Sequence, residues 1–288
     1  MRRIDAHQHF WKLSRGDYGW LTPELSAIYR DFLPDDLRPL MQAEGIDGTV
    51  LVQAAPSDAE TDFMLSLADE NAFIRGVVGW VDFESPDAPA RIAELAAHPC
   101  LKGLRPMIQD IPDPDWMLHP QRDAAFRALI DHGLVFDALV LPRHLKNLAV
   151  LVDRYPEMTV VIDHCAKPDI ASGAFEAWAE DMAALATREQ VSCKLSGLVT
   201  EAGESWNRET LQPYADHVLT VFGPGRVIWG SDWPVCTLAA SYSEWCEATA
   251  ALLQRFDGEA RAAILGGNAG RIYGLTRARL SRSSAQFH

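Results

Sequence analysis

The sequence has little positive charge, few cysteines and no long apolar segment. Lys and Arg number 26 against 40 Asp and Glu, so the formal net charge of −14 argues against nucleic acid or an anionic membrane surface as the main partner. No apolar run approaches the ~20 residues of a membrane-spanning helix, and charged residues come too early in the chain for a signal peptide. The five cysteines form no CxxC pair, so we expect reduced thiols in a cytoplasmic protein.

What the sequence does contain is a regular alternation of short apolar runs and amphipathic stretches of helical length. Several runs are apolar on both faces, which is typical of parallel strands covered by helices. The runs predict eight strands, over 4–9, 48–53, 74–82, 101–107, 134–140, 159–164, 191–196 and 227–232. The stretches between them predict helices, among them 58–72, 120–133, 145–155, 174–187 and 209–222.

The spacing of the strands favours a closed barrel. From position 9 to position 232 there are 223 residues over seven steps. This is about 32 residues per step, close to the ~31 expected when ~250 residues form eight β/α units. A doubly wound sheet usually has a glycine-rich first turn, whereas here that turn is His-Gln-His-Phe-Trp. We therefore predict an α/β fold, a single-domain (β/α)8 TIM barrel over 1–276, with 11–34 as a loop covering the active site and 277–288 as a frayed tail.

Polar side chains gather at the predicted strand ends, where a barrel keeps its active site. His7 and His9 close the first strand with a spacing that puts both on one face. Two converging imidazoles can hold a divalent cation or polarise a carbonyl, although an HxH pair on its own is often a surface loop. His164 closes the sixth strand, where the alternative is a core histidine bonded to backbone. Asp232 closes the eighth strand and is placed to deprotonate a water, the alternative being a helix cap.

Further residues are weaker candidates. Lys194 on the seventh strand is a candidate catalytic residue, because a lysine that faces the lumen needs an anion or a polarised oxygen, and Ser196 shares its face. We expect Asp163 to point away from the lumen and Lys167 to be solvated. The substrate-binding candidates, each with a structural alternative such as a loop amide, an ion pair or core packing, are Gln53, Arg105, Trp20, Trp116 and His144.

Four segments together resemble the amidohydrolase superfamily, within it the amidohydrolase 2 branch of barrel lactonases. They are the segments 4–11, 161–168, 193–198 and 229–235, and the resemblance runs from about Ile4 to Gly274. It implies a (β/α)8 barrel that hydrolyses a sugar lactone, of the L-fuconolactone or L-rhamnonolactone type, to its aldonic acid. It also implies His7, His9, His164 and Asp232 as the central set, which would hold a metal.

The metal content stays open between one divalent cation, zinc, and none. In the broader superfamily a Lys or His on the fifth strand completes a metal centre, but here no lysine closes that strand and His144 lies past its apparent end. Two other functions are kept as alternatives: a metal-dependent decarboxylase of an aromatic or unsaturated acid, and a non-catalytic sugar-binding barrel. The oligomeric state is not determined, and a homo-oligomer is compatible with the sequence.

Overall fold

A computed structural model describes residues 3–203 and 205–275, so the predicted tail 277–288 lies outside the described residues. Eight parallel strands pair in chain order from β1 to β8. They are β1 Ile4–Gln8, β2 Gly48–Val52, β3 Ile74–Gly79, β4 Leu101–Leu104, β5 Val135–Ala138, β6 Val160–Ile162, β7 Val191–Leu195 and β8 Val227–Trp229. A parallel bridge between Gln8 and Trp233 brings the two ends of the sheet together, so the predicted (β/α)8 barrel is confirmed.

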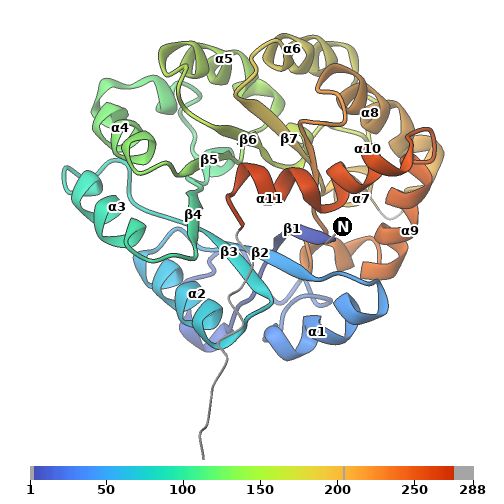
Figure 1. Cartoon of the computed structure of the whole chain (residues 1–288), viewed down its shortest axis with the longest axis horizontal. Helices are drawn as coiled ribbons and strands as arrows, with labels where there is room; N and C mark the ends of the chain where they lie inside the picture. The colour runs from blue at the N-terminus through green and yellow to red at the C-terminus, as the bar shows by residue number, and fades with distance from the viewer. Residues whose placement is uncertain (1–2, 204, 276–288) are drawn as a thin grey trace, which may run out of the picture.

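Most of the helices form a ring around the strands (Figure 1). The α-helices are α1 Pro34–Ala43, α2 Asp58–Glu70, α3 Ala88–Ala96, α4 Asp123–Asp131, α5 Leu145–Arg154, α6 Glu176–Ala186, α7 Leu198–Ala202, α8 Arg208–Val221, α9 Tyr242–Leu252, α10 Gly258–Ala262 and α11 Asn268–Ile272. Short 3₁₀ helices and one π-helix lie in the connections: η1 Leu13–Arg15, η2 Ile108–Asp110, η3 Trp116–Leu118, η4 Pro120–Arg122, η5 Pro142–His144, η6 Asp163–Ala166, η7 Val235–Leu238 and η8 Ala263–Gly267. Within the described residues, no helix combines the length and apolar character needed to cross a membrane.

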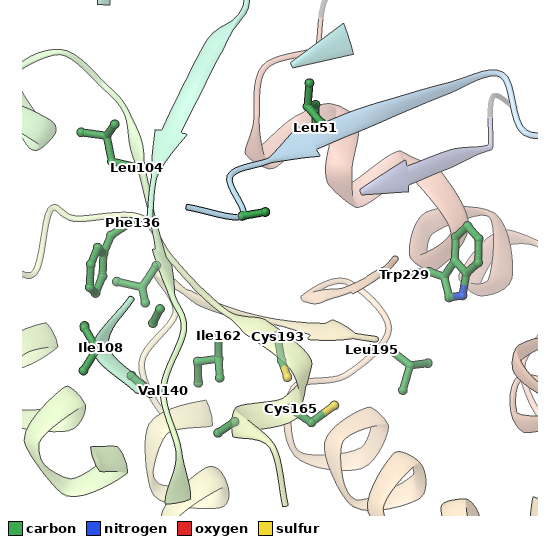
Figure 2. Packing of buried hydrophobic residues seen from close by; sticks show 14 of the residues in the cluster. Leu51, Leu104, Ile108, Phe136, Val140, Ile162, Cys165, Cys193, Leu195 and Trp229 are labelled. Carbon is green, nitrogen blue, oxygen red and sulfur yellow. The ribbon is translucent and has the colours of Figure 1, made fainter. Parts of the chain in front are cut away.

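Side-chain alternation along the strands divides the core into two layers. A small inner cluster contains Val50 and Val52 of β2, Val161 of β6 and Ile228 of β8. Their neighbours on the opposite face, such as Leu51, belong to the larger layer between barrel and helices. Figure 2 labels members of that larger layer: Leu51, Leu104, Ile108, Phe136, Val140, Ile162, Cys165, Cys193, Leu195 and Trp229.

One end of the barrel is covered by the chain itself. In Figure 1, α11 (red) lies across the centre of the ring of strands. Ala269 of α11 and Tyr273, which follows it, are buried within the inner cluster. The interior is therefore a packed core at this end, and a barrel of this kind keeps its active site at the opposite end, where the strands finish.

The strands end earlier than the sequence predicts. β3, for example, ends at Gly79 rather than at position 82, and β6 ends at Ile162 rather than at position 164. His9, His164 and Asp232 therefore lie just past the ends of their strands, whereas His7 lies within β1 and Lys194 within β7.

Candidate active site

Three imidazoles and one carboxylate converge at the barrel mouth. Nε2 of His9 lies 3.2 Å from Nε2 of His7 and 3.2 Å from Oδ1 of Asp232. Nε2 of His7 and Nε2 of His164 lie 3.7 Å and 3.8 Å from the same carboxylate oxygen. None of the four residues is more than 4% exposed. The ends of β1, β6 and β8 therefore build one compact polar centre.

Local backbone irregularities aim these side chains. In the pairing of β1 with β2, Asp5 lies opposite Thr49 and Gln8 opposite Leu51, so β1 accommodates one extra residue next to His7. After β6 the chain turns sharply, with a left-handed φ of 51° at His164. A non-glycine residue in this region is uncommon and marks a functional or strained position.

Two glycines make room for the rings. A Cβ atom at Gly197 would lie 2.8 Å from Nδ1 of His164, and one at Gly230 would lie 2.6 Å from Cβ of His7. Real Cβ atoms do not approach so closely, so both positions require glycine for the rings to keep their places.

In His9 and His164, the ring nitrogen that faces away from the centre contacts a neighbouring oxygen. Nδ1 of His9 lies 2.7 Å from the carbonyl oxygen of Val52. Because a carbonyl can only accept, this nitrogen carries the hydrogen and Nε2 faces the centre. Nδ1 of His164 lies 2.9 Å from Oγ of Ser196 and its Nε2 likewise points inward.

Burial and charge set the protonation of the centre. Burial, followed by the charge of Lys194, holds the pKa of His7 well below its ordinary value. Burial also lowers the pKa of His164 to about 4, so this ring is neutral near pH 7. Burial alone would raise the pKa of Asp232, but the surrounding histidines, His164 foremost, outweigh it and place that pKa below its usual range. The centre therefore presents an ionised Asp232 carboxylate beside the neutral rings of His7 and His164.

Beneath the centre lies a chain of buried charges built around Lys194. Its Nζ lies 2.5 Å from Oδ2 of Asp137, 2.9 Å from Oδ1 of Asp163 and 3.3 Å from Nδ1 of His7. The hydroxyl of Tyr273 donates to Asp137 at 2.9 Å. Contacts thus run from the helix that closes one end of the barrel to the histidines at the other.

Arg105 and Gln53 form a second buried pair beside the centre. The guanidinium of Arg105 donates to the backbone carbonyl of Gln53 and lies 3.3 Å from Oδ2 of Asp163. In return, the Gln53 amide donates to the backbone carbonyl of Arg105 at 2.7 Å. The Gln53 amide nitrogen is therefore already engaged within the protein.

Two adjoining cavities open at this end of the barrel. The central cavity, about 300 Å³, is lined by residues that include His9, His164, Asp232 and Arg105. The second cavity, about 700 Å³, lies beside it and shares Trp20, Met107 and Asp110 with its lining. A ligand in the central cavity would touch the polar centre directly.

Residues 4–275, which include the barrel and all four residues of this centre, match the amidohydrolase family. The chain belongs to the amidohydrolase family. This amidohydrolase is 48% identical over 282 residues to L-fucono-1,5-lactonase of Burkholderia ambifaria, covering 96% of each chain. It is 37% identical over 299 residues to L-fucono-1,5-lactonase of Burkholderia multivorans, covering 95% of this chain and 96% of that one.

A solved structure has the same fold. An amidohydrolase from Burkholderia multivorans with bound zinc is similar at a TM-score of 0.90 and 37% identity, with 96% of this chain and 100% of that chain covered. The family resemblance predicted from the sequence is therefore confirmed.

The donor set at the centre of the amidohydrolase fits a metal cation. Nε2 of His9 and Oδ1 of Asp232 both present lone pairs at 3.2 Å, so a proton or a metal cation has to lie between them. Tetrahedral Zn²⁺ with bonds of about 2.0–2.1 Å spaces its ligands about 3.4 Å apart. The spacings of 3.2–3.7 Å among the donor atoms of His7, His9 and Asp232 match this within small side-chain movements, and Nε2 of His164 lies 3.8 Å from the same Asp232 oxygen. The ligand atoms of His7, His9 and Asp232 form one group that could hold an ion.

The buried charges fit a cation as well. At the barrel mouth, three buried carboxylates, Asp137, Asp163 and Asp232, accompany two buried cations, Lys194 and Arg105. One negative charge remains uncompensated in a low-dielectric site, and a bound cation offsets it.

Several candidate residues lie elsewhere than the sequence suggests. Asp163 does not point away from the lumen: it shares the face of Val161, an inner-cluster residue, and contacts Lys194. The expectation was wrong because the left-handed turn at His164 lets two consecutive side chains face the interior. Lys167 is not simply solvated either, because it lines the central cavity and lies 3.7 Å from Glu201.

His144 is not brought to the centre. It is buried in η5, where Nδ1 accepts the backbone N–H of Leu141 at 3.1 Å before α5 begins. Trp20 lines both cavities, whereas Trp116 lines only the second one. Lys194 lies beneath the cavities and is absent from the lining of either one.

Asp137 is the buried residue that reasoning from the sequence missed. A signal was present, since Asp137 is a charged residue within the otherwise apolar strand Val135–Ala138. It shares a face with Val135 of the inner cluster, so alternation alone places it in the lumen.

Proposed function

We propose that this amidohydrolase opens a sugar lactone, of the L-fucono- or L-rhamnono-type, to its aldonic acid. The observation that carries the proposal is the convergence of His7, His9, His164 and Asp232 beside a cavity of about 300 Å³, which His9, His164 and Asp232 line. That volume lies at the small end of the roughly 300–1,000 Å³ range of small-molecule sites. The 48% identity to an L-fucono-1,5-lactonase supports a lactone as the substrate.

Asp232 is the base in this reaction. Its ionised carboxylate borders the cavity and accepts a proton from a water as that water's oxygen bonds to the lactone carbonyl carbon. The ring C–O bond then breaks, and the alkoxide leaves as an alcohol after the proton returns from Asp232. The imidazoles of His9 and His164 line the cavity beside the reacting carbonyl, and the buried ring of His7 contacts that of His9.

The same four residues would hold one divalent cation, for which we propose zinc. When bound, this cation would polarise the lactone carbonyl and stabilise the developing oxyanion. Lys194 acts as a positioning residue, because it holds His7 and Asp163 and does not line the cavity.

Substrate hydroxyls would meet polar groups on the cavity wall. Arg105, Lys167 and Glu201 line the central cavity, and Trp20 and Leu25 of the segment 11–34 border it from the outside. We propose that this segment covers the bound lactone. We further propose that the enzyme acts in the cytoplasm, in keeping with its five free cysteines.

A lactone panel tests the proposal. L-fucono-1,5-lactone and L-rhamnonolactone are incubated with the purified protein, and acid release is followed with a pH indicator. Asp232→Asn is the test variant, and Asp35→Asn, whose side chain is 96% exposed, is the control. Elemental analysis of protein purified without chelator should find about one zinc per chain, and less in His9→Ala. No acid release above the spontaneous rate by the native protein would sink the proposal.

The alternatives predict other results. A decarboxylase would release CO₂ from an aromatic acid and needs a cation free to hold the carboxylate, yet Arg105 is engaged by Asp163 and by the Gln53 carbonyl. A non-catalytic sugar-binding barrel would turn over no lactone, so Asp232→Asn would leave ligand binding intact and have no turnover to reduce.

A further inference from the structure

The second cavity is larger than the central one and adjoins it. Its volume is about 700 Å³ against about 300 Å³. It is formed by the turn after β3, the turn after β4 and the covering segment, with Trp20, Met107 and Asp110 at the junction of the two cavities. A single sugar ring in the central cavity leaves this space empty.

Aromatic rings form much of the wall of the second cavity. They belong to Trp20, Trp80, Phe83 and Trp116. Two of these rings are fixed by hydrogen bonds: Nε1 of Trp20 donates to the Ala54 carbonyl at 2.7 Å, and Nε1 of Trp116 donates to Glu84 at 2.6 Å. Rigid indole faces offer apolar surface for the CH faces of a sugar ring.

The backbone of Trp80 is held from both sides. Its N–H donates to Oγ1 of Thr61, and its carbonyl accepts from the same hydroxyl, both at 2.8 Å. The side chain is half-buried and lines the second cavity but not the central one. A substitution of Trp80 therefore changes the lining of the second cavity and not that of the central one.

The lining of the second cavity is rich in carboxylates. It includes Asp17, Asp82, Glu84 and Asp110 and no Lys, Arg or His, while Arg15 and Arg122, which are not part of the lining, pair with Asp17 and Glu84. Oδ1 of Asp17 is buried and has no hydrogen-bond partner among the described residues. Carboxylates accept hydrogen bonds from hydroxyls and repel anions, so the lining favours a neutral polyol over an acidic group.

We propose that the second cavity binds a glycosyl group carried on a hydroxyl of the lactone, so that the substrates include lactones of oxidised disaccharides. The inference rests on the proposed lactonase function and adds a substrate class to it. The lactone ring occupies the central cavity, and the attached neutral sugar lies against Trp80 and its aromatic neighbours.

Matched lactones test this inference. The substrates are L-fucono-1,5-lactone, its derivatives with one β-D-glucosyl group at O2, O3 or O4, and the corresponding glucuronyl derivatives. Trp80→Ala removes the aromatic surface, Trp80→Phe retains one, and thermal unfolding of each variant checks that it is folded. We expect Trp80→Ala to lower kcat/KM by about tenfold for at least one glucosyl lactone and to change kcat/KM for the unsubstituted lactone by less than about twofold. Trp80→Phe should keep most of the native kcat/KM for the glucosyl lactone. The glucuronyl counterpart should react more slowly than the glucosyl one.

The outcomes separate this inference from the function on which it rests. If native protein opens the unsubstituted lactone but no glucosyl derivative, or if Trp80→Ala affects both kinds of lactone equally, the second cavity is not a sugar subsite and the lactonase function stands. If native protein opens no lactone at all, both proposals fail.

Discussion

Nζ of Lys194 lies 2.5 Å from Oδ2 of Asp137, and both residues are completely buried. Burial raises the pKa of Asp137 to about 6, while the neighbouring Lys194 acts to lower it. Asp137 and Asp163 together balance the lysine charge, and Asp163 in turn faces His7. The ammonium group of Lys194 beneath the active site is therefore bound by two carboxylates, which come from β5 and from the end of β6.

Asp137→Asn should destabilise the protein because it replaces the carboxylate nearest to the buried Lys194 ammonium by a neutral amide. We expect a loss of about 3 kcal/mol in the free energy of unfolding, measured by urea denaturation. The double variant Asp137→Leu, Lys194→Met removes both charges and should lose less stability than the sum of its single changes. A loss below about 1 kcal/mol for Asp137→Asn would contradict the importance of this ion pair.

Asp232→Asn should lower kcat for lactone opening by about 10²–10⁴-fold, the range that a general base supplies. The asparagine keeps the shape of the side chain but cannot take a proton from water. Initial rates at saturating lactone measure the effect, and Asp35→Asn should retain the native rate. Unchanged turnover by Asp232→Asn would show that another group is the base.

Gly197→Ala should impair catalysis more than its effect on stability suggests. Its φ of +70° costs an alanine about 1–2 kcal/mol, and the new Cβ would lie 2.8 Å from Nδ1 of His164. Gly173→Ala is the matched control, because its φ is +74° and nothing lies within 4 Å of the added Cβ. Thermal unfolding should show similar losses in both variants, whereas kcat should fall only in Gly197→Ala. Equal activity of the two variants would mean that His164 does not need its present position.

Glu60 should make stability depend on pH. It is completely buried, accepts from the Tyr18 hydroxyl at 2.7 Å and from the Ala54 N–H at 3.0 Å, and so ties the segment 11–34 to the barrel. Burial raises its pKa from 4.5 to about 7. The folded state thus holds the proton more tightly, and this stabilisation is complete below about pH 4.5 and lost as the pH rises through about 7.

Glu60→Gln should remove that dependence. Relative to the native protein, the variant should gain up to about 2–3 kcal/mol in unfolding free energy between pH 5 and pH 8. Urea denaturation at both pH values measures the difference. A constant difference between variant and native protein across this range would contradict the raised pKa of Glu60.

The architecture and the central residues followed from local properties of the sequence. Apolar β-branched runs about 32 residues apart predict an eight-stranded barrel because each β/α unit consumes a nearly constant length of chain. Barrel geometry then brings the carboxyl ends of all strands to one rim. Histidines and a carboxylate at those ends, His7, His9, His164 and Asp232, were therefore predictable as neighbours, although they are far apart in the chain.

Only the tertiary structure decided which polar groups face each other beneath that rim. Strand alternation predicts the face of a side chain while the backbone stays regular, and the left-handed turn at His164 ends that regularity, which is why the direction of Asp163 was mispredicted. The partners of Lys194, and the placement of His144 away from the centre, depend on distances across the barrel and on the exact end of each strand. Such distances are set by the packing of the whole chain, so no local pattern of residues contains them.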